Sequence, residues 1–167
     1  MLPPYNIFNK KARGKVVMDF FTVNKSTLNY RRVKRLDEKV VVFVLPNVTL
    51  GASEVEIRFP FKGRIVDVYA SCSGKGTTKT TLDVEKCSQV EYDKVGTAPT
   101  WKSIFTEMLT IDSHLKSSKN SATTYVLDTT TSAVDVSDHF RVNIKGVGNG
   151  IKGLTVEVVI ELSIEEQ

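Results

Sequence analysis

Apolar and polar side chains alternate along much of the chain after residue 38. The clearest case is residues 154–164, where an apolar residue occupies every second position and threonine or glutamate fills most positions between. Residues 54–59 alternate in the same way. Successive side chains of a strand leave opposite faces of its sheet, so a period of two predicts strands with one buried face.

Other short runs are rich in β-branched and apolar residues and end at Gly, Pro, Ser or Asn, which is typical of strands separated by turns. These predicted strands are 40–45 (VVVFVL, expected to be buried), 64–70, 79–86, 122–128 and 140–145. Residues 112–122 are a predicted polar loop, and 101–108 fit a short helix or a strand equally well. The expected fold is all-β: an antiparallel β-sandwich, and most specifically a jelly roll of about eight strands.

Residues 1–38 have no core-forming pattern. Pro3 and Pro4 favour an extended backbone, and the apolar residues within 16–21 (VVMDFF) would need a partner to pack against. We interpret residues 1–38 as an extended arm that packs on its own sandwich or on a neighbouring subunit, and residues 39–167 as the jelly-roll domain. A mobile tail is the alternative.

Charge separates these two parts of the chain. Residues 1–35 contain nine basic side chains and one acidic residue, Asp19, which gives +8, whereas the whole chain is +4. Such an excess usually marks a segment that contacts phosphates or an acidic protein surface. The residues expected to dock the arm, with two phenylalanines as apolar anchors, are Lys10, Lys11, Arg13, Phe20, Phe21, Arg31, Arg32, Lys34 and Arg35. Nucleic-acid binding through the same arm, or a merely solvated basic face, remains open.

Several classes of protein are disfavoured. No run of about 18 apolar residues is present, so no membrane span is expected. The GxGxxG match at 148–153 precedes a predicted strand instead of a helix, so we expect a hairpin turn. Asp138 and His139 are adjacent on a predicted strand and would face opposite ways, which argues against a catalytic triad. Cys72 and Cys87 are expected to be free thiols, because a hairpin at 74–77 would hold them too far apart. We therefore expect no cofactor, no metal and no enzymatic activity.

Trp101 is the one candidate for ligand recognition by stacking. A tryptophan beside the polar loop at 112–122 could form part of a glycan-binding platform, as aromatic faces do on many β-sandwiches. Core or interface packing is the competing interpretation, because Ile104, Phe105 and Leu109 follow it closely in sequence.

Residues 59–162 resemble a jelly-roll module that recurs in structural proteins of tailed bacteriophages. The matching pieces occur in order: FPFKGRI at 59–65, LDV at 82–84, SIF at 103–105, LTI at 109–111, DHFRVNI at 138–144 followed by GVG at 146–148, and GLTVEV at 153–158. Thr100-Trp101-Lys102 departs from the glycine turn that such modules often have before Ser-Ile-Phe.

The resemblance implies a virion component of the head, neck, tail or baseplate, made in the cytoplasm of the host bacterium, with no catalytic residues. Expected partners are other virion proteins and further copies of the chain. The alternative is a receptor- or glycan-binding β-sandwich of a tail or head fibre.

Overall fold

The computed structural model describes residues 38–163. The chain divides into two units, residues 1–38 and 39–167, so the described residues belong almost entirely to the second. Within them the fold is all-β, as predicted: the only helices are a one-turn α-helix, α3 (Gln89–Tyr92), and a 3₁₀ turn, η1 (Ser118–Asn120).

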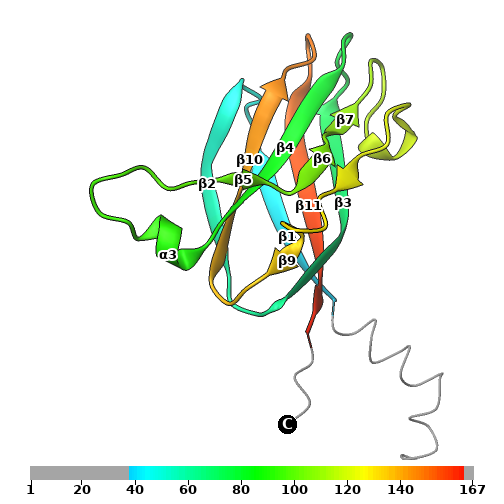
Figure 1. The fold of residues 1–167 in the computed structure, drawn as a ribbon. Coiled ribbons are helices and arrows are strands. Elements are labelled where there is room, and N and C mark those ends of the chain that lie inside the picture. The colour runs from blue at the N-terminus through cyan, green and yellow to red at the C-terminus, as the bar shows by residue number, and fades with distance from the viewer. Residues whose placement is uncertain (1–37, 164–167) are drawn as a thin grey trace, which may run out of the picture. The chain divides into compact units, whose positions relative to one another are not determined.

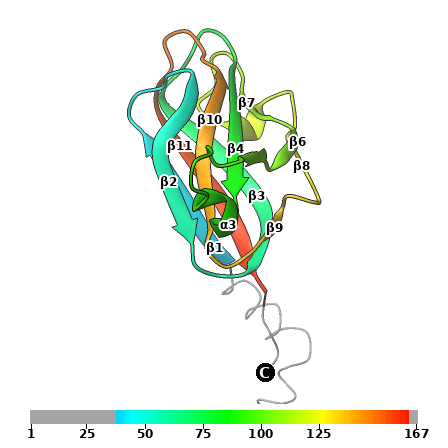
Figure 2. The ribbon, with the colours of Figure 1, turned by 60° about the vertical axis from the view of Figure 1, so that its left-hand side comes forward.

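The strands form two layers that face each other (Figures 1 and 2). In order across the sheet, sheet A contains β1 (Glu38–Leu45), β11 (Lys152–Leu162), β3 (Gly63–Gly74) and β9 (Ala133–Val134). Sheet B contains β2 (Gly51–Phe59), β10 (Asp138–Gly146), β4 (Thr80–Cys87) and β5 (Lys102–Ser103), with β7 (Leu109–Ile111) also paired to β4. A separate small ribbon joins β6 (Phe105–Glu107) to β8 (Val126–Leu127).

The strand order defines a jelly roll. Strands pair from the two ends of the domain inward: β1 lies beside β11, β2 beside β10, β3 beside β9, and β4 beside β5. In a jelly roll the chain forms one long antiparallel ribbon of such strand pairs, and successive pairs along the ribbon lie alternately in the two sheets. The sequence prediction of a jelly-roll sandwich is therefore confirmed.

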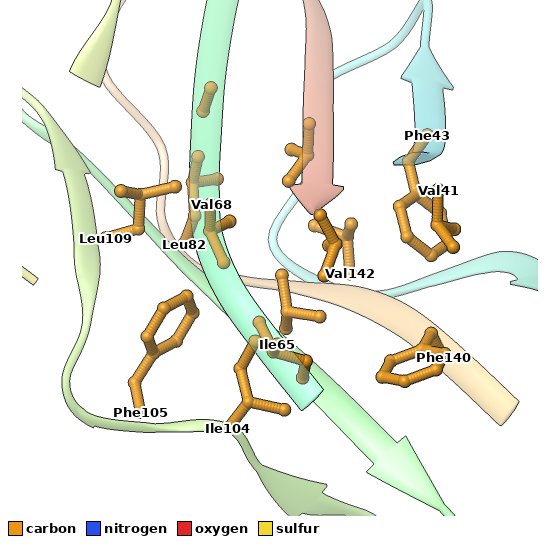
Figure 3. Close-up of a cluster of buried hydrophobic side chains, with 14 of the residues drawn as sticks. Val41, Phe43, Ile65, Val68, Leu82, Ile104, Phe105, Leu109, Phe140 and Val142 are labelled. Atoms are coloured by element: carbon orange, nitrogen blue, oxygen red, sulfur yellow. The ribbon is translucent and has the colours of Figure 1, made fainter. Parts of the chain in front are cut away.

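The core lies between the two sheets, and the alternation of the strands supplies it. On β11, Leu154, Val156, Val158 and Ile160 point inward and are fully buried. Side chains from both sheets and from the loop before β6 meet there, as Figure 3 shows for Phe43, Val68, Leu82, Ile104, Phe140 and Val142. Burying a side chain of this size stabilises the fold by roughly 1.5–3 kcal/mol.

A bulge changes which side chains of β3 face the core. The pairing of β3 with β11 shifts between Val159 and Ile160, so Val66 and Asp67 are both exposed, while Ile65 and Val68 on either side are buried. Strict alternation would instead have put Ile65 and Asp67 on one face and Val66 with Val68 on the other. The extra residue in a bulge is left unpaired and restarts the alternation one position later.

Two local predictions were wrong in detail, and one open alternative is decided. The expected strand at 122–128 is reduced to β8, Val126–Leu127. Residues 101–108, for which a helix and a strand were both open, contain the short strands β5 and β6. The turns expected at 74–77 and 148–153 do not close hairpins, because β3 and β4 lie in different sheets, as do β10 and β11. Consecutive strands of a rolled ribbon cross between sheets, which local sequence patterns do not reveal.

These two turns are held against each other. The backbone N–H of Gly148 donates to Thr80 Oγ1 at 2.9 Å, and the N–H of Thr77 donates to the carbonyl oxygen of Asn149 at 2.8 Å. Gly148 lies so close to the other turn that a Cβ atom there would be 2.4 Å from the carbonyl oxygen of Thr78. A side chain at position 148 would therefore push the two crossovers apart.

Replacing Gly148 with Ala tests this contact. We expect the free energy of unfolding to fall by about 2 kcal/mol or more, because the backbone must move to admit the methyl group. Gly146→Ala is the matched control, since its Cβ would meet only Thr81, at an ordinary 3.6 Å. Urea unfolding of both variants measures the difference, and equal stabilities would contradict the assignment.

Candidate interaction surface

The four edges of the two sheets differ in how they are protected. The edges β9 and β5 have two residues each, too short to recruit another strand. The edge β2 is long but carries the exposed charges Glu54, Glu56 and Arg58, and its pairing with β10 contains a bulge. Charges and bulges are common devices against edge-to-edge pairing. The remaining edge, β1, has charged side chains only at its first two residues, Glu38 and Lys39.

The outward face of β1 is a row of three valines. Val40, Val42 and Val44 are 51%, 45% and 62% exposed, while Val41, Phe43 and Leu45 between them are buried. Among the described residues, no strand pairs with β1 on the side away from β11. The expectation that the whole of 40–45 is buried was therefore wrong for half of its residues. A β1 partner that covered the valines would gain about 1 kcal/mol for each.

The outer face of sheet B carries a dense charged cluster instead. Glu85 on β4 accepts hydrogen bonds from Arg141 Nε at 2.8 Å and Asn143 Nδ2 at 2.7 Å, and Lys145 Nζ lies 3.2 Å from it. Asp83, two residues earlier, accepts from Ser103 Oγ at 2.7 Å and lies 3.7 Å from Lys145. Neighbouring strands place these side chains together because β4 and β10 are paired in register.

The two buried carboxylates of this cluster respond differently to their surroundings. Burial raises the pKa of Asp83, and the hydrogen bond from Ser103 offsets only part of that effect. Burial also favours the neutral form of Glu85, but its bonds from Asn143, Arg141 and Lys145 outweigh it and hold the pKa below the ordinary value. The cations and carboxylates thus satisfy one another, and the cluster joins β4 to β10.

Aromatic rings continue this surface toward the segment 88–101, which extends away from the sandwich at α3 (Figure 1). The guanidinium of Arg141 lies 4.2 Å from the ring centroid of Trp101. Tyr92 meets Trp101 edge to face and stacks on His139 at 3.8 Å between ring centroids. His139 Nε2 also lies 3.0 Å from Gln89 Oε1. These contacts attach the 88–101 segment to sheet B.

Trp101 is half-buried in this outer layer. Ile104, Phe105 and Leu109, which follow it in sequence, are in the core, whereas Trp101 is not, so core packing of Trp101 was wrong and interface packing stays a prediction. Arg141 covers one face of its ring, and a role in glycan binding stays a prediction. The predicted docking residues of the arm, Lys10 to Arg35 with Phe20 and Phe21, lie outside the described residues.

The other candidate groups are separated by the fold. Asp138 forms an ion pair with Lys86 at 3.2 Å, whereas His139 contacts Gln89 and Tyr92, which agrees with the expectation that they face opposite ways. Cys72 and Cys87 are free and buried, as expected, but lie in different sheets. Burial raises the pKa of both thiols.

Two features of these surfaces were missed at the sequence level. The cluster of Asp83, Glu85, Arg141 and Lys145 depends on the register between β4 and β10. Polar residues at alternate positions, Asp83 and Glu85 on one strand and Arg141, Asn143 and Lys145 on the other, were a visible signal. The valine row was missed because an uninterrupted apolar run gives no indication of which face is exposed.

Comparison with known protein families, with curated proteins and with solved structures finds no match to this chain. In the part of the chain that the structure describes, no helix has the length and apolar character needed to cross a bilayer. Within residues 38–163, no three His, Cys, Asp or Glu side chains are grouped so that they could hold a metal ion.

The charged cluster predicts how stability depends on pH. Because the pKa of Glu85 is lower in the folded than in the unfolded chain, its contribution is complete above the ordinary value of 4.5 and is lost as the pH falls toward the folded value. We expect Glu85→Gln to lower the free energy of unfolding by about 2 kcal/mol at pH 7 and to lose less further stability on acidification than the wild type.

Asp83→Asn is the matched control. Since burial raises the pKa of Asp83, its ionised form is unfavourable in the folded state, and removing that charge should cost less at pH 7 than removing the charge of Glu85. Urea unfolding between about pH 3 and pH 7, followed by Trp101 fluorescence, measures both variants. Equal losses in the two variants would contradict the assignment.

Proposed function

We propose that this chain is a non-enzymatic structural protein of a bacteriophage virion, which assembles through the surfaces of its jelly roll and through its basic N-terminal segment. The observation that carries the proposal is the edge strand β1, which pairs with no strand on its outer side within residues 38–163 and presents an exposed valine row. The resemblance of residues 59–162 to a jelly-roll module of tailed phages supports the same class of protein.

An assembled particle gives a reason for the unprotected edge. A long edge strand with exposed apolar side chains is an aggregation hazard in a protein that works alone, and sandwich proteins generally block such strands. The other long edge, β2, is protected by charges and a bulge. A subunit that is permanently covered by its neighbours can keep β1 open, because the assembly itself removes the exposed surface.

The N-terminal segment would add an electrostatic contact to this assembly. Residues 1–35 carry +8, while the remainder of the chain carries −4, so the segment is attracted to acidic surfaces of neighbouring subunits. The proposed partners are other virion proteins and further copies of the chain, at the head, neck, tail or baseplate. The protein would be made in the cytoplasm of the host bacterium and become part of the particle there.

Incorporation into particles tests the proposal. The test variant replaces four basic residues of the segment with glutamine: Arg31→Gln, Arg32→Gln, Lys34→Gln and Arg35→Gln. We expect peptides of the wild-type chain to be found by mass spectrometry in virions purified from the producing host, and the variant to be at least about tenfold depleted because steering and docking are weakened.

The matched control removes four positive charges from exposed lysines of the jelly-roll domain: Lys75→Gln, Lys79→Gln, Lys116→Gln and Lys119→Gln. It should be incorporated like the wild type. A wild-type chain that stays in the soluble lysate and is absent from purified virions would refute the proposed function. Equal depletion of both variants would refute the role of the N-terminal segment.

A further inference from the structure

We infer that β1 pairs with the β1 strand of a second copy of this chain, antiparallel and across a two-fold axis at Val42. This inference rests on the proposed function, because the proposed function depends on β1 and the inference names the partner of β1. The pairing would join the two copies of sheet A into one continuous sheet, with the backbone groups on the open side of β1 hydrogen-bonded between copies.

The strand is self-complementary in this register. With Val42 opposite Val42, Val40 lies opposite Val44, so the outward valine row meets an identical row over its full length. On the inward face, Val41 lies opposite Phe43, and the two cores meet across the boundary. Directly opposite β-branched and aromatic residues are favourable cross-strand pairs.

No like charges oppose each other in this arrangement. Lys39 lies opposite Leu45, and Glu38 lies opposite Pro46, which ends the strand. A register centred on Val41 would instead place Glu38 against Val44, and one centred on Phe43 would leave Val40 opposite Pro46. The register centred on Val42 is the one that matches all three valines.

A second copy fits this edge better than a different protein. β1 has no charged or polar side chain between Val40 and Leu45 that could select a partner of another sequence. A two-fold contact of a strand with itself closes after two copies, so it covers the edge without starting an open fibre.

Cysteine cross-linking of the full chain tests the register. Val42→Cys should form a disulfide-linked dimer under mild oxidation, because Cα atoms of directly opposed residues lie within disulfide reach. Val40→Cys and Val44→Cys should each cross-link poorly alone, but at least about tenfold better when the two variants are mixed, since residues four apart along a strand are beyond that reach.

Val95→Cys is the control, because Val95 is 98% exposed in the loop after α3 and is more accessible than Val42. The native Cys72 and Cys87 are buried and free. In addition, Val42→Lys should shift the chain to a smaller species in sedimentation at fixed concentration, and Val95→Lys should not. Circular dichroism verifies that each variant keeps its β-structure.

The possible outcomes separate the two proposals. Efficient cross-linking at Val42, with exchange between positions 40 and 44, establishes the pairing. An oligomer that incorporates into virions but cross-links no better at Val42 than at Val95 overturns this inference and leaves the proposed function in place. A wild-type chain that sediments as a monomer at all concentrations overturns the pairing and counts against assembly through β1.

Discussion

The apolar core between the two sheets, to which the central strands β10 and β11 both contribute, is the interaction on which the rest of the structure depends. Each of these strands is hydrogen-bonded on both sides, and their inward faces meet in the middle of the sandwich. Phe140 and Val142 of β10 and Val156 and Val158 of β11 are all fully buried. A short crossover joins the two strands, so the packing of their inward side chains sets the distance between the sheets. The outer strand pairs add further apolar side chains to this core on either side.

The jelly-roll arrangement around this core also determines which strands lie at the edges of the sheets. In the part of the chain that the structure describes, β1 has one neighbouring strand, β11, and so lies at the border of sheet A. Its inward residues Val41 and Phe43 are needed for the core, while its outward residues are free of that constraint. The packing of the described residues therefore does not require the valines at 40, 42 and 44, and the proposed contact with a second copy would give a reason for them.

Much of the fold could be predicted from the sequence, because alternation within one strand is a local signal. The strand β11 was predicted at 154–164 and lies at Lys152–Leu162, with the expected buried face from Leu154 to Ile160. The same alternation indicated β2, and a run of apolar residues indicated β10. Long-range pairing left no such signal: nothing near Cys72 or Cys87 indicates that their strands belong to different sheets. The bulge at Val66 and Asp67 was missed for the same reason, since it depends on the register with β11.

The two outer faces of the sandwich now have different physical roles. On sheet B, Glu85 and Asp83 are buried beneath Arg141, Asn143, Lys145 and Ser103, so the polar groups of that face already have partners within the same copy. Covering such a face with a partner would gain little, because these ionic contacts are already made and desolvating them further is costly. On sheet A, covering the valine row would remove apolar surface from water. Under the proposed assembly, this contrast between the satisfied polar groups of sheet B and the exposed valines of β1 would favour contact at β1.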